Sequence, residues 1–161
     1  EAARQAGLSG VVLGASLPDG RLDIEKLERL VDEAGEMQKT LHRAIDLVPD
    51  MAEAVEQAIA LGFDTILTSG RASSALEGIA DLERAHNVAD GRIAIMAGAG
   101  VNAATAPHIL GRVPLAAVHG SCSEPVPPDS DVAQRLGFVS PTRRATSPDK
   151  VAALKAALAV H

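Results

Sequence analysis

Side chains that could transfer protons or hold a charged ligand lie at the ends of short apolar segments of this sequence. His42 and Asp46 are candidates for a general acid or base. A second set offers cationic, hydroxyl and backbone groups for an anionic ligand: Arg43, Thr68, Ser69, Gly98, Gly100, Asn102 and Ser121. Each candidate also has a structural alternative, because an Arg within a strand can serve as a salt-bridge partner and a Thr or Ser can satisfy loop backbone groups.

His119 and Cys122 form the pair whose residue types best suit a metal ion. An imidazole and a thiolate three positions apart could share a metal if the chain turns after the strand that precedes them. The alternative is that Cys122 is a small buried apolar residue. His42 and Asp46, placed on one strand, would lie about 13 Å apart, which is too far to chelate one ion.

The segment from Gly98 to Asn102 could present backbone N–H groups at the start of a helix. The segment from His119 to Ser121 would lie beside it on the next strand. In β/α barrels the loops after the last two strands are the usual phosphate site, so the sequence predicts a small phosphorylated or carboxylated ligand here. A formal match to the dinucleotide fingerprint, Gly98-x-Gly100-x-x-Ala103, is discounted because it follows the fourth strand rather than the first.

Five β-rich segments position these residues, and their starts are roughly 23 to 30 residues apart, the length of one β/α unit. They are residues 10–15, 40–46, 65–70, 93–100 and 116–122. Helix signals fall between them, including N-cap candidates at Asp23 and Asp50 and a Ser147-Pro148 helix start. Such alternation predicts either an open doubly wound sheet or a closed eight-stranded barrel. Residues 123–131 and 137–146 are predicted to be loops, and residues 1–161 a single domain.

Composition excludes several classes of partner. The 161 residues are 47% apolar, carry a formal net charge of −6 and contain neither Trp nor Tyr, so we expect no nucleic-acid partner. No apolar run approaches the roughly 20 residues that span a bilayer, so we expect no membrane partner. The single cysteine is compatible with a reducing compartment, and the expected location is the cytoplasm.

Several motifs occur in the order in which they occur in the CutC family. Residues 40–46, 66–70, 75–78, 95–101 and 118–121 read T-L-H-R-A-I-D, I-L-T-S-G, A-L-E-G, I-M-A-G-A-G-V and V-H-G-S. They resemble the family's T-F-H-R-A-F-D, I-L-T-S-G, A-L-E-G, I-M-P-G-G-G-V and H-x-S. Ala97 and Ala99 stand where the family has Pro and Gly, and Ser123 where a basic residue is usual. A loop that needs positive φ at position 99 would therefore carry a side chain.

This resemblance implies a TIM-barrel type α/β fold, (β/α)₈, of which about five units are present and the N-terminal units are missing. It also implies a role in copper homeostasis or copper binding, with copper as a cofactor on the strength of the family alone. The alternative is a TIM-barrel enzyme acting on a small anionic substrate, and a third hypothesis is that a partial barrel does neither. Unpaired strand edges make a homo-oligomer a further expectation.

Overall fold

A five-stranded parallel sheet forms the centre of the computed structural model, which describes residues 2–127, 130–140 and 142–159. Its strands are β1 (Gly10–Leu13), β2 (Gln38–Leu41), β3 (Thr65–Thr68), β4 (Ala94–Ala97) and β5 (Ala117–Val118). Each strand pairs with its neighbour in sequence, in the order β1-β2-β3-β4-β5. A doubly wound sheet reverses its strand order at a switch point, whereas a β/α barrel adds strands in one direction. The sheet is therefore of the barrel type.

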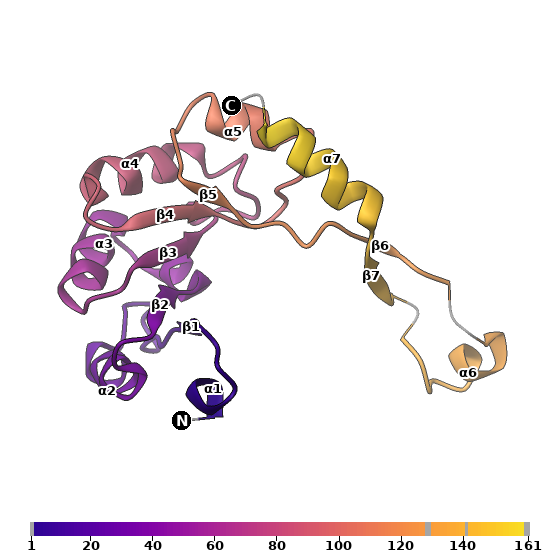
Figure 1. Ribbon diagram of the computed structural model, residues 1–161, viewed down its shortest axis with the longest axis horizontal. Coiled ribbons are helices and arrows are strands. Elements are labelled where there is room, and N and C mark those ends of the chain that lie inside the picture. Colours follow the sequence, from indigo (N-terminus) through magenta and orange to yellow (C-terminus); the bar gives the residue numbers. More distant parts are fainter. Residues whose placement is uncertain (1, 128–129, 141, 160–161) are drawn as a thin grey trace.

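Helices connect the strands and cover one side of the sheet, where α2, α3 and α4 lie beside one another (Figure 1). The helical elements before β5 are α1 (Ala2–Gln5), α2 (Ile24–Ala34), the 3₁₀-helix η1 (Arg43–Leu47), α3 (Met51–Ala60), α4 (Ile79–Ala89) and α5 (Ala106–Leu110). Two N-cap predictions are confirmed, because the carboxylates of Asp23 and Asp50 accept hydrogen bonds from backbone N–H groups in the first turns of α2 and α3. None of the described helices is long and apolar enough to cross a membrane.

The hydrophobic core lies between the sheet and these helices. In β3 and β4 alternate side chains are buried, as the two-residue period of a strand requires, with Ile66 and Ile95 among them. The largest fully buried side chains also include Leu27, Leu41, Ile45, Met51, Leu82 and Ile109. Full burial of such a side chain contributes about 1.5–3 kcal/mol, so this layer holds the strand ends in register.

The predicted strand over residues 40–46 is wrong in its second half. β2 ends at Leu41, and the chain continues as the 3₁₀-helix η1. His42 Nδ1 accepts a hydrogen bond from the Ala44 N–H at 3.0 Å, which caps the first turn of η1. The separation of about 13 Å expected between His42 and Asp46 assumed an extended strand. It does not apply to a helical turn.

The two predicted loops after β5 contain regular structure. β6 (Ser123–Pro125) and β7 (Arg144–Thr146) pair antiparallel, and α6 (Asp131–Arg135) lies between them in sequence. α7 (Pro148–Leu158) then returns to pack against α5, and Leu154 of α7 is buried. Figure 1 shows β6, β7 and α6 projecting from the end of the sheet opposite β1. Strands of three residues are too short to give a periodic signal, which explains why the sequence did not reveal them.

The turn after β4 has positive φ at position 99, where this sequence has Ala and the CutC motif has Gly. Ala99 has φ of 74° and Gly100 has φ of 71°. Positive φ brings the Cβ of an L-residue too close to its own backbone, at a cost of roughly 1–2 kcal/mol. Ala99 therefore stores strain in the turn.

We predict that Ala99→Gly raises the free energy of unfolding by about 1 kcal/mol, because glycine adopts this φ without a steric penalty. Chemical denaturation of the two proteins measures the difference. Ala104→Gly is the matched control, because Ala104 lies in the following turn at ordinary φ and its replacement should not stabilise the protein. If Ala99→Gly is less stable than the original protein, the inference that Ala99 is strained is wrong.

Candidate functional site

A pocket opens at the carboxyl ends of β4 and β5. Its volume is about 850 Å³, which is within the range of small-molecule sites. The lining residues come from the turn after β4, the segment after β5, and the C-terminal strand and helix. They are Arg43, Leu67, Gly98, Ala99, Gly100, Val101, Asn102, Ala103, Ala104, His119, Gly120, Ser121, Cys122, Ser123, Arg144, Lys150 and Ala153. Four of them are basic or imidazole side chains and none is a carboxylate.

Short hydrogen bonds fix the turn after β4 at one wall of this pocket. The Gly98 N–H donates to the Thr68 carbonyl at 2.9 Å, which continues the pairing of β4 with β3. Asn102 Oδ1 accepts from the N–H groups of Ala104 and Thr105, so the side chain caps the turn that leads into α5. A Cβ at position 98 would lie 2.6 Å from a methyl carbon of Leu67, so a larger residue there would displace the end of the Leu67 side chain.

The segment after β5 forms the neighbouring wall. The His119 N–H donates to the Ala97 carbonyl at 2.7 Å and so aligns the end of β5 with the end of β4. Beyond it Cys122 adopts φ of 47°, and the hydroxyls of Ser121 and Ser123 lie 3.1 Å apart. Residues 119–123 therefore line the same cavity as the turn at residues 98–102. The sequence predicted that these two segments would be neighbours on adjacent strands.

Arg43 reaches the pocket from η1 and is held by a carboxylate and a hydroxyl. Its Nε donates to Asp46 Oδ2 at 2.6 Å, and its Nη2 donates to Ser69 Oγ at 2.7 Å. The Arg43 side chain is 44% exposed, whereas that of Asp46 is only 8% exposed. The buried Asp46 carboxylate thus holds the guanidinium of Arg43, which remains partly exposed.

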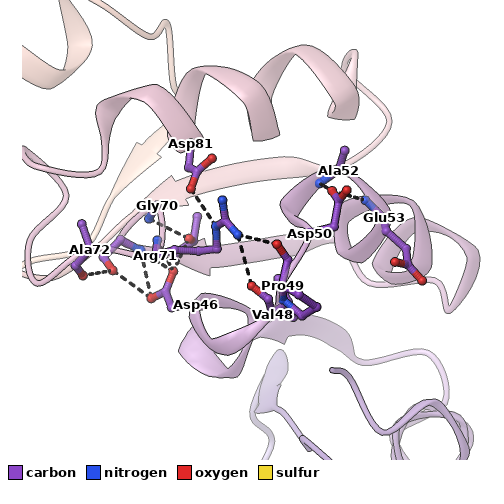
Figure 2. Close-up of polar contacts among 12 residues, drawn as sticks. Asp46, Val48, Pro49, Asp50, Ala52, Glu53, Gly70, Arg71, Ala72 and Asp81 are labelled. Atoms are coloured by element: carbon purple, nitrogen blue, oxygen red, sulfur yellow. Dashed lines mark hydrogen bonds and ion pairs between the residues drawn. The ribbon is translucent and has the colours of Figure 1, made fainter. Parts of the chain in front are cut away.

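The Asp46 carboxylate is the centre of a larger network. It accepts from Thr68 Oγ1 at 2.5 Å, from the Ser69 N–H at 3.1 Å and from the Arg71 N–H at 3.2 Å. Figure 2 shows Asp46 beneath the turn that carries Gly70 and Arg71. In the same figure the Arg71 side chain continues from this turn to Asp81, with which it forms an ion pair at 2.7 Å. The network joins η1 to the end of β3.

Burial raises the pKa of Asp46, but the hydrogen bonds from Thr68, Arg43, Arg71 and Ser69 outweigh it and leave the pKa below the ordinary value. A carboxylate held in this way stays ionised. The structure thus gives Asp46 the properties of a positioning group, and its candidacy as a general acid or base remains a prediction.

His42 lies outside the pocket, against Gly14 at the end of β1. A Cβ at position 14 would overlap the His42 ring, so the imidazole packs directly on the glycine backbone. Because His42 Nδ1 accepts from the Ala44 N–H, the neutral ring carries its proton on Nε2. In this form Nε2 is a hydrogen-bond donor, and the role of His42 as a general acid or base remains a prediction.

The sequence candidates therefore divide into two groups. The pocket brings together Arg43, Gly98, Gly100, Asn102, His119, Ser121 and Cys122. His42, Asp46, Thr68 and Ser69 lie outside it, the last three in the network that supports Arg43. Arg144 and Lys150 line the pocket but were not candidates. The composition of residues 137–146, rich in Arg, Thr and Ser, was a signal for Arg144, whereas Lys150 belongs to the helix predicted to start at Ser147-Pro148.

The side chains around His119 and Cys122 show whether a metal site could form there. His119 and Cys122 line one cavity, as their spacing suggested. Within residues 2–127, 130–140 and 142–159, however, no group of three or more His, Cys, Asp or Glu side chains is arranged to hold a metal ion. Any metal bound here by the described residues would therefore have fewer than three His, Cys, Asp or Glu ligands.

We predict that Asp46→Asn lowers the free energy of unfolding at neutral pH by about 2 kcal/mol, because it replaces a charged acceptor of several hydrogen bonds. The pKa of Asp46 is lower in the folded protein than in the unfolded chain, so its carboxylate stabilises the fold at pH values above the unfolded pKa. This contribution to the free energy of unfolding is lost as the pH falls below about 4. Denaturation at pH 7 and pH 3 should therefore show a smaller acid-induced loss in the variant than in the original protein. Asp90→Asn, at an exposed position, is the control, and equal acid losses in all three proteins would contradict the prediction.

Comparisons with known proteins agree with this arrangement. The model of the CutC family matches residues 1–124. A CutC family protein of Agrobacterium fabrum (strain C58 / ATCC 33970) is 52% identical over 164 residues, and one of Sinorhizobium medicae (strain WSM419) is 50% identical over 158 residues. These alignments cover 100% and 98% of this chain but 64% of each relative, so the chain spans less than two thirds of their length.

A solved structure supports the fold. The crystal structure of CutC from Streptococcus agalactiae, which is named for copper homeostasis, superimposes with a TM-score of 0.69 at 29% sequence identity. The match covers 73% of this chain and 58% of that one. With the sequential parallel sheet and the family match, these relationships show that the chain belongs to the CutC family and forms five β/α units of its TIM-barrel type fold.

Proposed function

We propose that this CutC family protein binds a small organic anion, bearing a phosphate or a carboxylate, in the pocket at the ends of β4 and β5. The observation that carries the proposal is the charge of the lining, where Arg43, Arg144 and Lys150 are cations and no lining residue is a carboxylate; Asp46 and Glu124 pair with Arg43 and Lys150 from outside the lining. The chain as a whole is acidic, with a formal net charge of −6. A cationic cavity in an acidic protein concentrates anions locally.

The walls of the pocket complement this charge. Asn102 lies at the start of the turn that leads into α5, and Ser121 adds a hydroxyl. Phosphate sites at this end of β/α barrels also use backbone N–H groups. In this turn the N–H groups of Asn102, Ala104 and Thr105 already donate to side chains of the turn, so the side chains of the lining carry the proposal. The Arg43 guanidinium is already held by Asp46 and Ser69, so less conformational entropy is lost when an anion binds.

The size of the pocket indicates an organic ligand rather than a bare ion. A volume of about 850 Å³ accommodates a molecule well beyond inorganic phosphate. Leu67, Val101 and Ala153 supply apolar surface for its carbon skeleton. The same scaffold is compatible with the enzyme hypothesis, for which His119 lies within the cavity, whereas the acid–base candidates His42 and Asp46 lie outside it.

We predict that Arg43→Gln weakens the binding of inorganic phosphate about tenfold or more, because a hydrogen bond to a charged group contributes about 1.5–3 kcal/mol. Isothermal titration calorimetry measures the affinity. Arg112→Gln is the control, since it removes an exposed arginine that pairs with Glu83 outside the pocket. Arg43→Lys should retain part of the affinity. Phosphate affinity that is equal in the Arg43→Gln and Arg112→Gln proteins would overturn the proposal.

Copper handling is the second candidate function. The name of the S. agalactiae relative suggests it, and the specific observation in its favour is that His119 and Cys122 line the same pocket. A thiolate and an imidazole suit copper, although the described residues include no third His, Cys, Asp or Glu side chain arranged with them. Copper binding by this chain would accordingly depend on these two side chains.

Titration with Cu(I) against a competing chelator tests this second candidate. If the chain binds copper, Cys122→Ser and His119→Gln should each reduce copper retention at least tenfold, because each removes one of two donors. Cys122 and His119 lie within four positions, so loss in both variants would place the metal in the pocket. If the unmodified protein retains no more copper than the Cys122→Ser and His119→Gln proteins, the copper role is excluded for this chain.

A further inference from the structure

Part of the cationic lining comes from a segment beyond the family match. The family model ends at residue 124, whereas Arg144 lies in β7 and Lys150 lies in the first turn of α7. Both side chains line the pocket, together with Ala153 of the same helix. The C-terminal segment therefore adds two of the three permanent positive charges to a cavity whose other walls belong to the matched region.

Both cations converge on one residue at the rim of the pocket. Arg144 donates from Nη2 to the Ser123 carbonyl at 2.8 Å and from Nε to Ser123 Oγ at 3.0 Å. Lys150 Nζ donates to the same carbonyl at 3.1 Å. A carbonyl oxygen has two lone pairs and accepts both donors, which holds the guanidinium and the ammonium beside each other.

Their charges are only weakly compensated by protein groups. Among the described residues, the Glu124 carboxylate lies 3.6 Å from Lys150 Nζ, and both side chains of that pair are about half exposed at 48% and 47%. An exposed pair of this kind contributes about 0–1 kcal/mol and leaves most of the positive potential in place. The carboxylate is also not part of the pocket lining.

The segment is built into the fold. Ser123 pairs with Thr146 in the β6–β7 ladder, and the Ser147 N–H donates to the Cys122 carbonyl at 2.9 Å. Leu154 of α7 is 8% exposed and lies against Gly120, where an added Cβ would be 3.4 Å from its methyl carbon. These contacts fix the start of α7, and with it Lys150, over the end of β5.

We infer that Arg144 and Lys150 are specificity-determining residues of the pocket, and that they select phosphate monoesters over monocarboxylates. The inference rests on the proposed anion-binding function. Coulombic attraction to two neighbouring cations grows with the charge of the ligand, so a dianion gains about twice as much as a monoanion. The forked donors of an arginine also match the oxygens of a phosphate.

The test compares the affinities of inorganic phosphate and acetate at pH 7.5, followed by chemical-shift titration, which measures weak binding. In Arg144→Gln and in Lys150→Gln the phosphate affinity should fall about fivefold and the ratio of phosphate to acetate affinity about twofold, because acetate, with half the charge, loses about half as much attraction. Lys155→Gln is the matched control, because it removes the same charge from the same helix outside the pocket lining. Its ratio should equal that of the unmodified protein.

Two further measurements separate the possible failures. Arg144→Lys keeps the charge and should keep most of the selectivity, and thermal unfolding midpoints verify that each variant is folded. If the unmodified protein does not bind phosphate, the proposed function and this inference both fall. If it binds phosphate and Arg43→Gln weakens that binding, while the ratio is unchanged in folded Arg144→Gln and Lys150→Gln proteins, only this inference is overturned.

Discussion

The arrangement of the site depends on the hydrogen bonds that the Asp46 carboxylate accepts. This carboxylate accepts hydrogen bonds from η1 and from the end of β3, and so joins two consecutive β/α units at their carboxyl ends. Its burial would be costly without those donors, since an unpaired carboxylate at this depth loses its hydration. With them it stays ionised and directs Arg43 into the pocket. A single carboxylate thus fixes the local structure and positions one of the three cations of the cavity.

The sheet topology explains why the other pocket residues meet. Parallel strands added in one direction bring every carboxyl end to the same edge, so the turn after β4 and the segment after β5 are neighbours although about 20 residues separate them in the chain. The hairpin of β6 and β7 then carries the chain outward, and α7 returns over the end of β5. The cavity is therefore assembled from the barrel units and from a C-terminal segment beyond the residues that the family model matches, although the CutC relatives align over it.

Sequence patterns predicted the sheet, the helix caps and the glycine turn because these follow from local periodicity and from single residues such as Asp50 and Gly98. They misplaced the end of β2, since the apolar run through Ile45 continues into a 3₁₀ turn whose cap is a histidine rather than a usual capping residue. They also missed Arg144 and Lys150, because the pairing of Ser123 with Thr146 is non-local and leaves no periodic trace. The family motifs identified Arg43, but only the structure shows which carboxylate holds it.

The central claim is that the cavity at the ends of β4 and β5 binds an oxyanion. Titration of the ¹⁵N-labelled protein with inorganic phosphate tests it most directly, because each backbone amide reports on its own surroundings. The account predicts saturable shifts concentrated at residues 98–102 and 119–123, with smaller changes in α7. Shifts that do not saturate, or that centre on α2 and α3 on the covered side of the sheet, would contradict it.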